Sequence, residues 1–417
     1  MKKTDIEPQS VTVAGERSRT EPYELPAGWK WCKQSEVCKL TDGEKKSDVS
    51  YPYLEVKYLR GNKDKDFVSS GKFITARTKV ILVDGENSGE VFTVPEDGFM
   101  GSTFKALSIQ NVDENYLQFF IQTKKDLYRN NKKGSAIPHL NKDLFFNMPF
   151  PLPPTLAEQQ RIVSRIESLF TKLDEAKDRA QSVLDGFELR RAAVLHKAFT
   201  GELTANWRKE HGVSDDSWEE KTIGECCEVT SSKRIYQSEQ TQSGIPFLRV
   251  ADIIRKIQGE QVSPELYISE EMYQNLKSQN LVPKENEILV TARGTLGKCY
   301  LVKDNDTFYF QDGMISWLKN IANQILSVYL VFLFQSKEIT SQIDEKQNGS
   351  TVNYLSISML KEITIPVPTL PEQQEIVRIL DTVLEKESRA KEIAEYVLEQ
   401  IGLIKKSILA RAFRGEL

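Results

Sequence analysis

The chain has 417 residues, and its 56 Lys and Arg residues nearly balance its 60 Asp and Glu residues, giving a formal net charge of −4. Hydrophobic residues make up 39% of the chain and charged residues 28%, a composition that excludes wholesale disorder and allows sizeable buried cores. The charge balance also excludes a uniformly basic nucleic-acid coat, although it is compatible with local basic patches. At about 150 residues per domain, the length predicts two to three domains.

The N-terminal sequence and the cysteines predict a cytoplasmic protein. The opening sequence MKKTDIEPQS lacks the apolar core of a secretory signal. The longest apolar run, residues 325–334, is far shorter than the roughly 20 residues that a membrane span needs, so no membrane partner is expected. The five cysteines form no Cys-x-x-Cys pair, which favours reduced thiols.

Repeated motifs indicate an internal duplication. The sequence AFTGEL ends at Leu203 and AFRGEL ends at Leu417; at the same offset PTLAEQQRIV, from Pro154, falls on PTLPEQQEIV, from Pro368. The segments that precede these motifs are more divergent. The predicted order is a flexible N-terminal tail, a first variable domain, a first helical repeat, a second variable domain and a second helical repeat, at residues 1–20, 21–153, 154–211, 212–367 and 368–417.

The first variable domain has a mixed α/β pattern. A strand is expected over residues 79–83 (KVILV) and a helix over residues 114–123. Basic and acidic residues are nearly balanced here, so any DNA contact is expected from small clusters that can bond phosphates or base edges. The candidates in this domain are Arg77, Lys79, Lys132, Lys133 and Ser135.

The first helical repeat carries apolar residues at steps of three and four over residues 162–187, which is the heptad spacing of a coiled coil. Thr155 is the expected N-cap, Glu158 would complete a capping box, and Gly201 ends the helix. These features predict one continuous helix of about 45 residues, about 65 Å long at 1.5 Å per residue.

The second variable domain has a similar mixed pattern. Strands are expected over residues 248–250, 287–291 and 308–310, and a helix over residues 326–334. Small clusters of basic, amide and hydroxyl side chains recur here. The candidates for DNA contact are Arg249, Arg293, Lys298, Gln347, Ser350 and Thr351. In both domains the alternative is an ordinary solvated loop, and recurrence of the clusters at corresponding places favours a functional role.

The second helical repeat has the same seam, with Thr369 and Glu372 at its start. Glu387 interrupts this seam, and Arg190 interrupts the first. Apolar stripes of this length must be buried, and the simplest partner of each is the other copy. The predicted fold class is therefore α+β, with two mixed α/β domains separated by two long helices that pack as an antiparallel coiled coil about a pseudo-twofold axis. A coiled coil that only forms homodimers is the alternative.

No catalytic or metal site is expected. The loop at residues 293–299 lacks the first glycine of a phosphate-binding loop and has Cys299 where magnesium needs a Ser or Thr. Residues 147–150 depart from the Asn-Pro-Pro-Phe loop of amino-methyltransferases at Met148, and no glycine-rich cofactor loop precedes them. The three histidines have no metal-ligand spacing, so the chain alone is not expected to be an enzyme.

Three features together resemble the specificity subunits of Type I restriction–modification systems. They are the sequence LPAGWKW at residues 25–31, the doubled PTL-x-EQQ-x-IV motif and the doubled AF-x-GEL motif. The resemblance covers nearly the whole chain after about residue 20. It implies two target recognition domains, each reading one half of an asymmetric bipartite sequence in double-stranded DNA, and helices that set the spacer between the halves.

The resemblance also implies partners. Two modification subunits, which carry S-adenosylmethionine, and two restriction subunits, which use ATP and magnesium, are expected to assemble on the chain, which has no cofactor of its own. Sequence retained in both copies suits two equivalent docking sites, although helix capping explains the glutamates equally well. The docking candidates are Glu158, Gln159, Gln160, Glu372, Gln373, Gln374, Gly201, Glu202, Leu203, Gly415, Glu416 and Leu417. A stand-alone scaffold that binds two peptides is the alternative function, and a fused methyltransferase is disfavoured by the missing cofactor loop.

Overall fold

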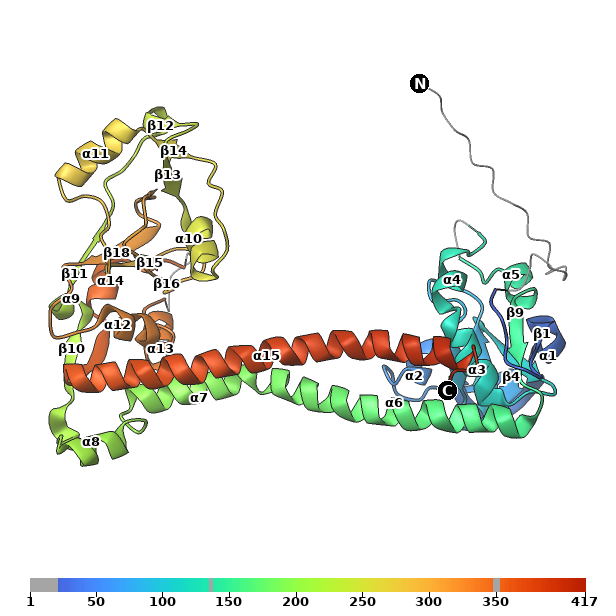
Figure 1. Ribbon diagram of the computed structural model, residues 1–417. Helices are drawn as coiled ribbons and strands as arrows, with labels where there is room; N and C mark the ends of the chain where they lie inside the picture. The colour runs from blue at the N-terminus through green and yellow to red at the C-terminus, as the bar shows by residue number, and fades with distance from the viewer. Residues whose placement is uncertain (1–21, 135–137, 348–352) are drawn as a thin grey trace, which may run out of the picture. The chain divides into compact units, whose positions relative to one another are not determined.

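The computed structural model describes residues 22–134, 138–347 and 353–417. The predicted tail at residues 1–20 and the candidates Ser135, Ser350 and Thr351 lie outside the described residues. The chain divides into a first unit, Met1–Ala180 with Tyr396–Leu417, and a second unit, Gln181–Glu395 (Figure 1). Each unit therefore combines one α/β domain with segments of both helical repeats.

The first unit contains a four-stranded sheet in the order β2-β8-β5-β6, a small closed barrel of β3, β4 and β7, and the pair β1-β9. Its elements are β1 Lys30–Lys33, α1 Gln34–Val37, β2 Cys38–Thr41, β3 Glu44–Leu54, α2 Val56–Leu59, β4 Phe67–Ile74, β5 Lys79–Leu82, β6 Val91–Thr93, β7 Gly98–Met100, β8 Phe104–Ile109, α3 Glu114–Thr123, α4 Lys125–Asn130, α5 Lys142–Phe146, β9 Pro149–Leu152 and most of α6 Leu156–Asp185.

The second unit contains two four-stranded sheets, β11-β18-β15-β16 and β12-β14-β13-β17, and the pair β10-β19. Its elements are α7 Phe187–Phe199, α8 Ala205–His211, η1 Asp215–Ser217, β10 Glu219–Thr222, α9 Ile223–Cys226, β11 Glu228–Ser231, η2 Gln237–Glu239, β12 Gln240–Thr241, β13 Ile245–Leu248, α10 Val250–Ile257, β14 Tyr267–Ile268, α11 Glu270–Ser278, β15 Ile288–Thr291, β16 Cys299–Leu301, β17 Tyr309–Phe310, β18 Ile315–Lys319, α12 Ser327–Leu333, α13 Lys337–Gln347, α14 Ile357–Lys361, β19 Thr364–Val367 and the larger part of α15 Leu370–Ala412.

The two α/β domains share a frame. The antiparallel sheet β2-β8-β5-β6 has the same strand order as β11-β18-β15-β16, and β1-β9 corresponds to β10-β19. Each domain also contains one strand that pairs in parallel with a short later strand. These parallel pairs are β3 with β7 and β13 with β17. The duplication detected in the helical repeats therefore extends through the variable domains.

Most of the predicted elements are present. β5 and β15 match the strands predicted at residues 79–83 and 287–291, and α3 matches the helix predicted at residues 114–123. The prediction at residues 248–250 was wrong for its second half, because the strand ends at Leu248 and α10 begins at Val250.

The second helical repeat forms one 43-residue helix, α15, but the prediction of one helix was wrong for the first repeat. That repeat consists of α6, with 30 residues, and α7, with 13, divided at Gly186. A Cβ atom at Gly186 would lie 2.3 Å from the Arg190 Nη1 atom. Arg190 also donates to the Val183 carbonyl at 2.9 Å, so its guanidinium occupies the break.

Within each unit the helical segments run in opposite directions. In the second unit the two residues that interrupt the seams pair with each other, because Arg190 Nε lies 2.9 Å from Glu387 Oε2. In the first unit Lys405 Nζ lies 2.5 Å from Asp174 Oδ1. The interruptions in the two seams are therefore a complementary ion pair.

Candidate nucleic-acid and subunit interfaces

The Phe of each AF-x-GEL motif fixes the end of a helical repeat to an α/β domain. In the first unit the Phe413 ring lies 4.9 Å from the Tyr116 ring of α3, and in the second the Phe199 ring lies 5.4 Å from the Tyr329 ring of α12. Both tyrosines are fully buried, and their hydroxyls donate to a proline carbonyl in β9 and in β19, at 3.0 and 2.9 Å. The same joint is therefore built twice.

The middle residue of each EQQ motif completes this joint. Gln159 Oε1 accepts a hydrogen bond from the Asp113 N–H at 2.7 Å, and Gln373 Oε1 accepts one from the Leu326 N–H at 2.9 Å. Asp113 and Leu326 are the N-cap residues of α3 and α12. Because Gln159 and Gln373 are buried and bonded inside the chain, their side chains are not available to a docking subunit.

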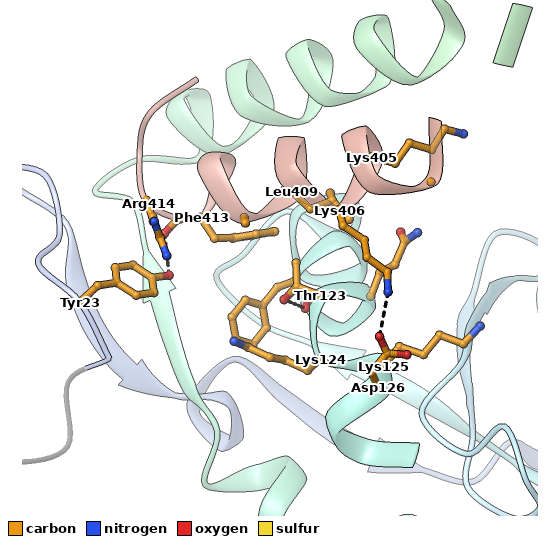
Figure 2. Close-up of a pocket in the computed structure, with 14 residues that line it drawn as sticks. Tyr23, Thr123, Lys124, Lys125, Asp126, Lys405, Lys406, Leu409, Phe413 and Arg414 are labelled. Carbon is orange, nitrogen blue, oxygen red and sulfur yellow. Dashed lines mark hydrogen bonds and ion pairs between the residues drawn. The ribbon is translucent and has the colours of Figure 1, made fainter. Parts of the chain in front are cut away.

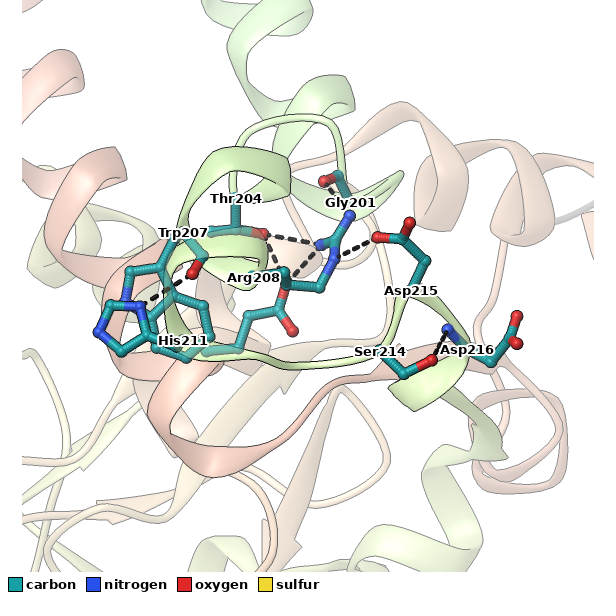
Figure 3. Close-up of polar contacts among 9 residues, drawn as sticks. Gly201, Thr204, Trp207, Arg208, His211, Ser214, Asp215 and Asp216 are labelled. Atoms are coloured by element: carbon teal, nitrogen blue, oxygen red, sulfur yellow. Dashed lines mark hydrogen bonds and ion pairs between the residues drawn. The ribbon is translucent and has the colours of Figure 1, made fainter.

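The first residue of the second EQQ motif, Glu372, is also internal. Its Oε1 atom accepts hydrogen bonds from Arg208 Nη1 and Thr204 Oγ1, both at 2.6 Å. Arg208, on α8, is buried and also bonds Asp215 and the Gly201 carbonyl, both at 3.0 Å (Figure 3). Burial opposes the charge of Arg208, but its hydrogen bonds to the two carboxylates outweigh burial and raise its pKa.

The capping boxes predicted at the two helix starts are incomplete. The Glu158 N–H donates to Thr155 Oγ1 at 3.2 Å, but the Glu158 carboxylate binds Arg161 at 2.8 Å. Glu372 has no capping role, because its Oε1 atom accepts from Arg208 and its Oε2 atom has no partner among the described residues. The buried polar contacts of Glu372 explain its position better than capping does.

Because Gln159, Glu372 and Gln373 are bonded inside the chain, the prediction of subunit docking is left with the candidates that reach the surface. Gly201 is buried, and four of the remaining candidates are partly exposed: Glu158, Leu203, Gly415 and Leu417. The exposed candidates form two equivalent pairs, Gln160 with Gln374 and Glu202 with Glu416.

One duplicated pair was missed from the sequence. Leu189 on α7 is 75% exposed and Leu403 on α15 is 54% exposed. The two leucines occupy the same position of the repeat, 214 residues apart like the AF-x-GEL motifs. In the sequence, both repeats have a leucine at this position although it lies outside the heptad seam, and this agreement could have identified the pair.

In the second domain, Arg293 and Lys298 are exposed in the turn that joins β15 to β16. The Arg293 guanidinium lies 4.8 Å from the centre of the Tyr354 ring. Gln347 is not free to contact DNA, because its amide both accepts from the Tyr354 N–H and donates to the Tyr354 carbonyl, each at 2.9 Å. Gln347 therefore braces the segment against which Arg293 packs.

Arg249 is exposed at the N-cap of α10, and its Nη1 atom lies 3.8 Å from Glu265 Oε2. Together with Arg255 it lines a small cavity of about 170 Å³. Asp252 and Glu265 line the same cavity, and Arg255 Nη1 lies 3.9 Å from Asp252 Oδ1, so both guanidinium groups face a carboxylate.

Lys79 in the first domain does not fit the predicted contact with DNA. It is 7% exposed, and its Nζ atom donates to Thr93, Asn115 and Gln118 at 2.6–2.8 Å. Burial lowers the pKa of Lys79. Its polar partners come from β6 and α3, so Lys79 is an internal link between sheet and helix.

The other candidates of the first domain differ in availability. Lys132 pairs with Glu86 at 2.5 Å and Lys133 pairs with Asp143, so both charges are already matched. Arg77 is exposed and has a positive φ of 67°. Among the described candidates of this domain, Arg77 alone combines exposure with no ion pair to a described residue.

A groove of about 480 Å³ lies in the first unit, beside the C-terminal part of α15 (Figure 2). Apolar side chains line it together with five cationic residues, Lys124, Lys125, Lys405, Lys406 and Arg414. In the second unit α13 covers the equivalent face of α7, with Ile339 fully buried and Glu338 bonded to His196. The groove is therefore not duplicated and does not meet the expectation of two equivalent docking sites.

The described residues contain no group of three or more His, Cys, Asp or Glu side chains arranged to hold a metal ion. None of the helices in this part of the chain is both long enough and apolar enough to cross a membrane.

Comparison with known proteins gives a family match over most of the chain. The family model for the Type I restriction modification DNA specificity domain matches residues 26–183 and 215–396. The chain is 26% identical over 414 residues to the Type I restriction enzyme MjaVIII specificity subunit of Methanocaldococcus jannaschii, with 94% of each chain covered. It is also 26% identical over 433 residues to the Type I restriction enzyme StySPI specificity subunit of Salmonella potsdam, covering 94% of this chain and 90% of that one.

Two solved structures share the fold. One, from work on complex assembly and conformational transition of the type I R-M system, aligns with a TM-score of 0.68 at 19% identity and covers 95% of this chain and 100% of that chain. The HsdS subunit from Thermoanaerobacter tengcongensis aligns with a TM-score of 0.63 at 19% identity, covering 95% and 99%. The fold with two α/β domains and two helical repeats is thus shared with these structures.

Proposed function

The chain belongs to the Type I restriction–modification DNA specificity family as a specificity subunit with two DNA-recognition domains, and from this premise we propose how it reads its target. Each α/β domain reads one half of an asymmetric, bipartite sequence in double-stranded DNA. The chain itself performs no catalytic step.

The observation that carries this proposal is a pair of equivalent turns with unlike side chains. The Leu140 N–H donates to the Val83 carbonyl at 2.7 Å, and the Leu355 N–H donates to the Ala292 carbonyl at 2.9 Å, so the same crossing segment flanks both turns. The β5–β6 turn carries Asp84, Glu86 and Glu90, each paired with a basic residue, whereas the β15–β16 turn carries the exposed Arg293. Two equivalent turns that carry different side chains can read two different half-sites, because base edges are recognised by the type of side chain that contacts them.

The helical repeats set the spacer between the half-sites in this proposal. Their equivalent joints to the two domains support a pseudo-twofold relation and an antiparallel coiled coil. The second helical repeat is the continuous helix α15, about 64 Å long at 1.5 Å per residue, and we expect it to act as a rigid spacer. We expect half-sites about one turn of DNA apart, near 34–36 Å.

Two modification subunits dock on the exposed duplicated residues, and two restriction subunits join the assembly. We assign S-adenosylmethionine to the modification subunits and ATP with magnesium to the restriction subunits. This chain supplies binding alone, and its nearly balanced charge predicts weak, salt-sensitive DNA binding that tightens when a modification subunit is added.

The test is to express the full chain with its modification subunit in cells without adenine methylation and to sequence the methylated sites. One bipartite motif with two unlike halves is expected. The double variant R293A/K298A should then relax one half only, by about 5- to 150-fold at the affected positions, because a good side-chain–base contact is worth about 1–3 kcal/mol. Methylation without a bipartite motif, or no methylation at all, would contradict the proposal.

A further inference from the structure

The strands β3 and β4 of the first domain form a ribbon whose outer face is polar and basic. They pair antiparallel, with Lys45 opposite Lys72 and Ser47 opposite Ser70. Lys45 and both serines are exposed, and Lys72 is partly exposed. In the second domain β12 and β14 pair over only two residues each, so no equally long ribbon is present among its described residues.

The packing of the barrel fixes which side chains point outward. A Cβ atom at Gly71 would lie 2.9 Å from the Phe99 ring, so position 71 faces the inside of the barrel. Phe73 also faces inward, with its ring 4.8 Å from that of Tyr51. Because successive residues of a strand alternate between faces, Ser70 and Lys72 point outward.

Of the two lysines on the outer face, Lys72 pairs with Asp42 and Lys45 has no ion pair among the described residues. Like charges directly opposite each other destabilise an antiparallel pair, yet Lys45 and Lys72 occupy such a position. Asp42 binds both Lys105 and Lys72, and these bonds lower the pKa of Asp42 to about 2. The charge of Lys45 is complementary to a polyanion.

A bulge separates this face from an exposed apolar edge. The register of the ribbon shifts between Ser47 and Tyr51, and Asp48 within the shift has a positive φ of 62°. Val49 is 44% exposed and Phe67 is 63% exposed. Bulges re-aim side chains beside functional sites, and apolar side chains in a DNA groove contact thymine methyl groups.

We propose that the outer face of the β3–β4 ribbon enters the major groove of the half-site read by the first domain. Lys45 bonds the O6 and N7 acceptors of guanine. Lys72 joins it by exchanging Asp42, which keeps Lys105 as its partner, and Ser47 and Ser70 bond neighbouring base edges. The major groove is about 12 Å wide and admits a two-stranded ribbon, and lysine is a common partner of guanine there. This inference rests on the proposed function and assigns the reading of one half-site to residues outside the sequence-based candidates.

The experiment uses the full chain in complex with its modification subunit and a DNA library randomised at both half-sites. The variants are K45A/K72A and S47A/S70A, and K142A, at an exposed lysine of α5, is the matched control. The methylated sequences report preference at both half-sites. We expect K45A/K72A to reduce guanine discrimination in one half-site by about 5- to 150-fold, S47A/S70A to do so more weakly, and K142A to match the wild type.

The second half-site is the internal control for folding. If K45A/K72A retains the wild-type preference at both half-sites, the ribbon does not read bases and the inference fails while the proposed function stands. A uniform loss of affinity over all sequences, with a shallower salt dependence, also overturns base reading because it is the signature of phosphate contacts. If the wild-type complex itself shows no bipartite motif, the proposed function fails and the inference fails with it.

Discussion

The two helical repeats begin with the same EQQ motif, but their first glutamates have different surroundings. Glu372 is fully buried against Arg208 of α8, whereas the Glu158 side chain is 30% exposed and pairs with Arg161 one turn along its own helix. Arg208 belongs to α8, which follows the AF-x-GEL motif of the first repeat. A repeated motif therefore predicts the same local helix start twice, while the energetic role of its charge depends on a neighbour from another segment.

The largest change in stability is expected when Glu372 loses its buried partner. Removing Arg208 in R208A leaves the Glu372 carboxylate buried without its cation, which should destabilise the second unit by about 3–5 kcal/mol. The matched variant R161A removes a partly exposed pair in the first unit and should cost about 0.2–1 kcal/mol.

Urea unfolding followed by tryptophan fluorescence measures both variants. Trp218 is a suitable probe, because the Arg208 guanidinium lies 6.0 Å from its ring. Equal losses for R208A and R161A would show that Glu372 is no more dependent on its partner than Glu158. The double variant R208M/E372L tests the cause, since it removes both charges and should recover part of the loss.

A smaller difference is expected between Gln373 and Gln159. Gln373 donates to the carbonyls of Gln324 and Pro368 as well as accepting from Leu326, whereas Gln159 accepts from Asp113. Truncation leaves these internal groups unpaired, at about 1–3 kcal/mol per site. Q373A should therefore lower the free energy of unfolding more than Q159A. Thermal unfolding of each variant beside Q160A, at an exposed position, measures the difference, and the reverse order would contradict it.

The sequence was sufficient for features that depend on local pattern. The duplication, the strands at β5 and β15 and the helix α3 follow from periodicity and from the repeated motifs. The break at Gly186 was not predicted, because the heptad spacing continues through it and the cause is the placement of the Arg190 guanidinium.

The candidate site was harder to predict than the fold, because exposure is decided by residues distant in the sequence. Lys79 begins a strand and has the charge expected for DNA contact, but Asn115 and Gln118 of α3 bind it inside the domain. Conversely, the pairing of Lys45 with Lys72 depends on the register of β3 and β4. Residue type predicted which side chains could contact DNA, but it did not predict which ones reach the surface.

The smallest expected effect concerns two positions at which the repeats agree. Leu189 and Leu403 are exposed at the same place in each copy, so each is expected to contribute an apolar contact to one modification subunit. Either L189S or L403S should weaken one of two docking events by about tenfold, equivalent to about 1.4 kcal/mol, and shift the assembly from two bound subunits toward one.

Native mass spectrometry over a titration with the modification subunit measures the stoichiometry, and L127S, at an exposed leucine of α4 outside the repeats, is the control. A loss of both subunits from either single variant would mean that docking is cooperative, and an unchanged stoichiometry for the double variant would exclude this duplicated pair from the interface.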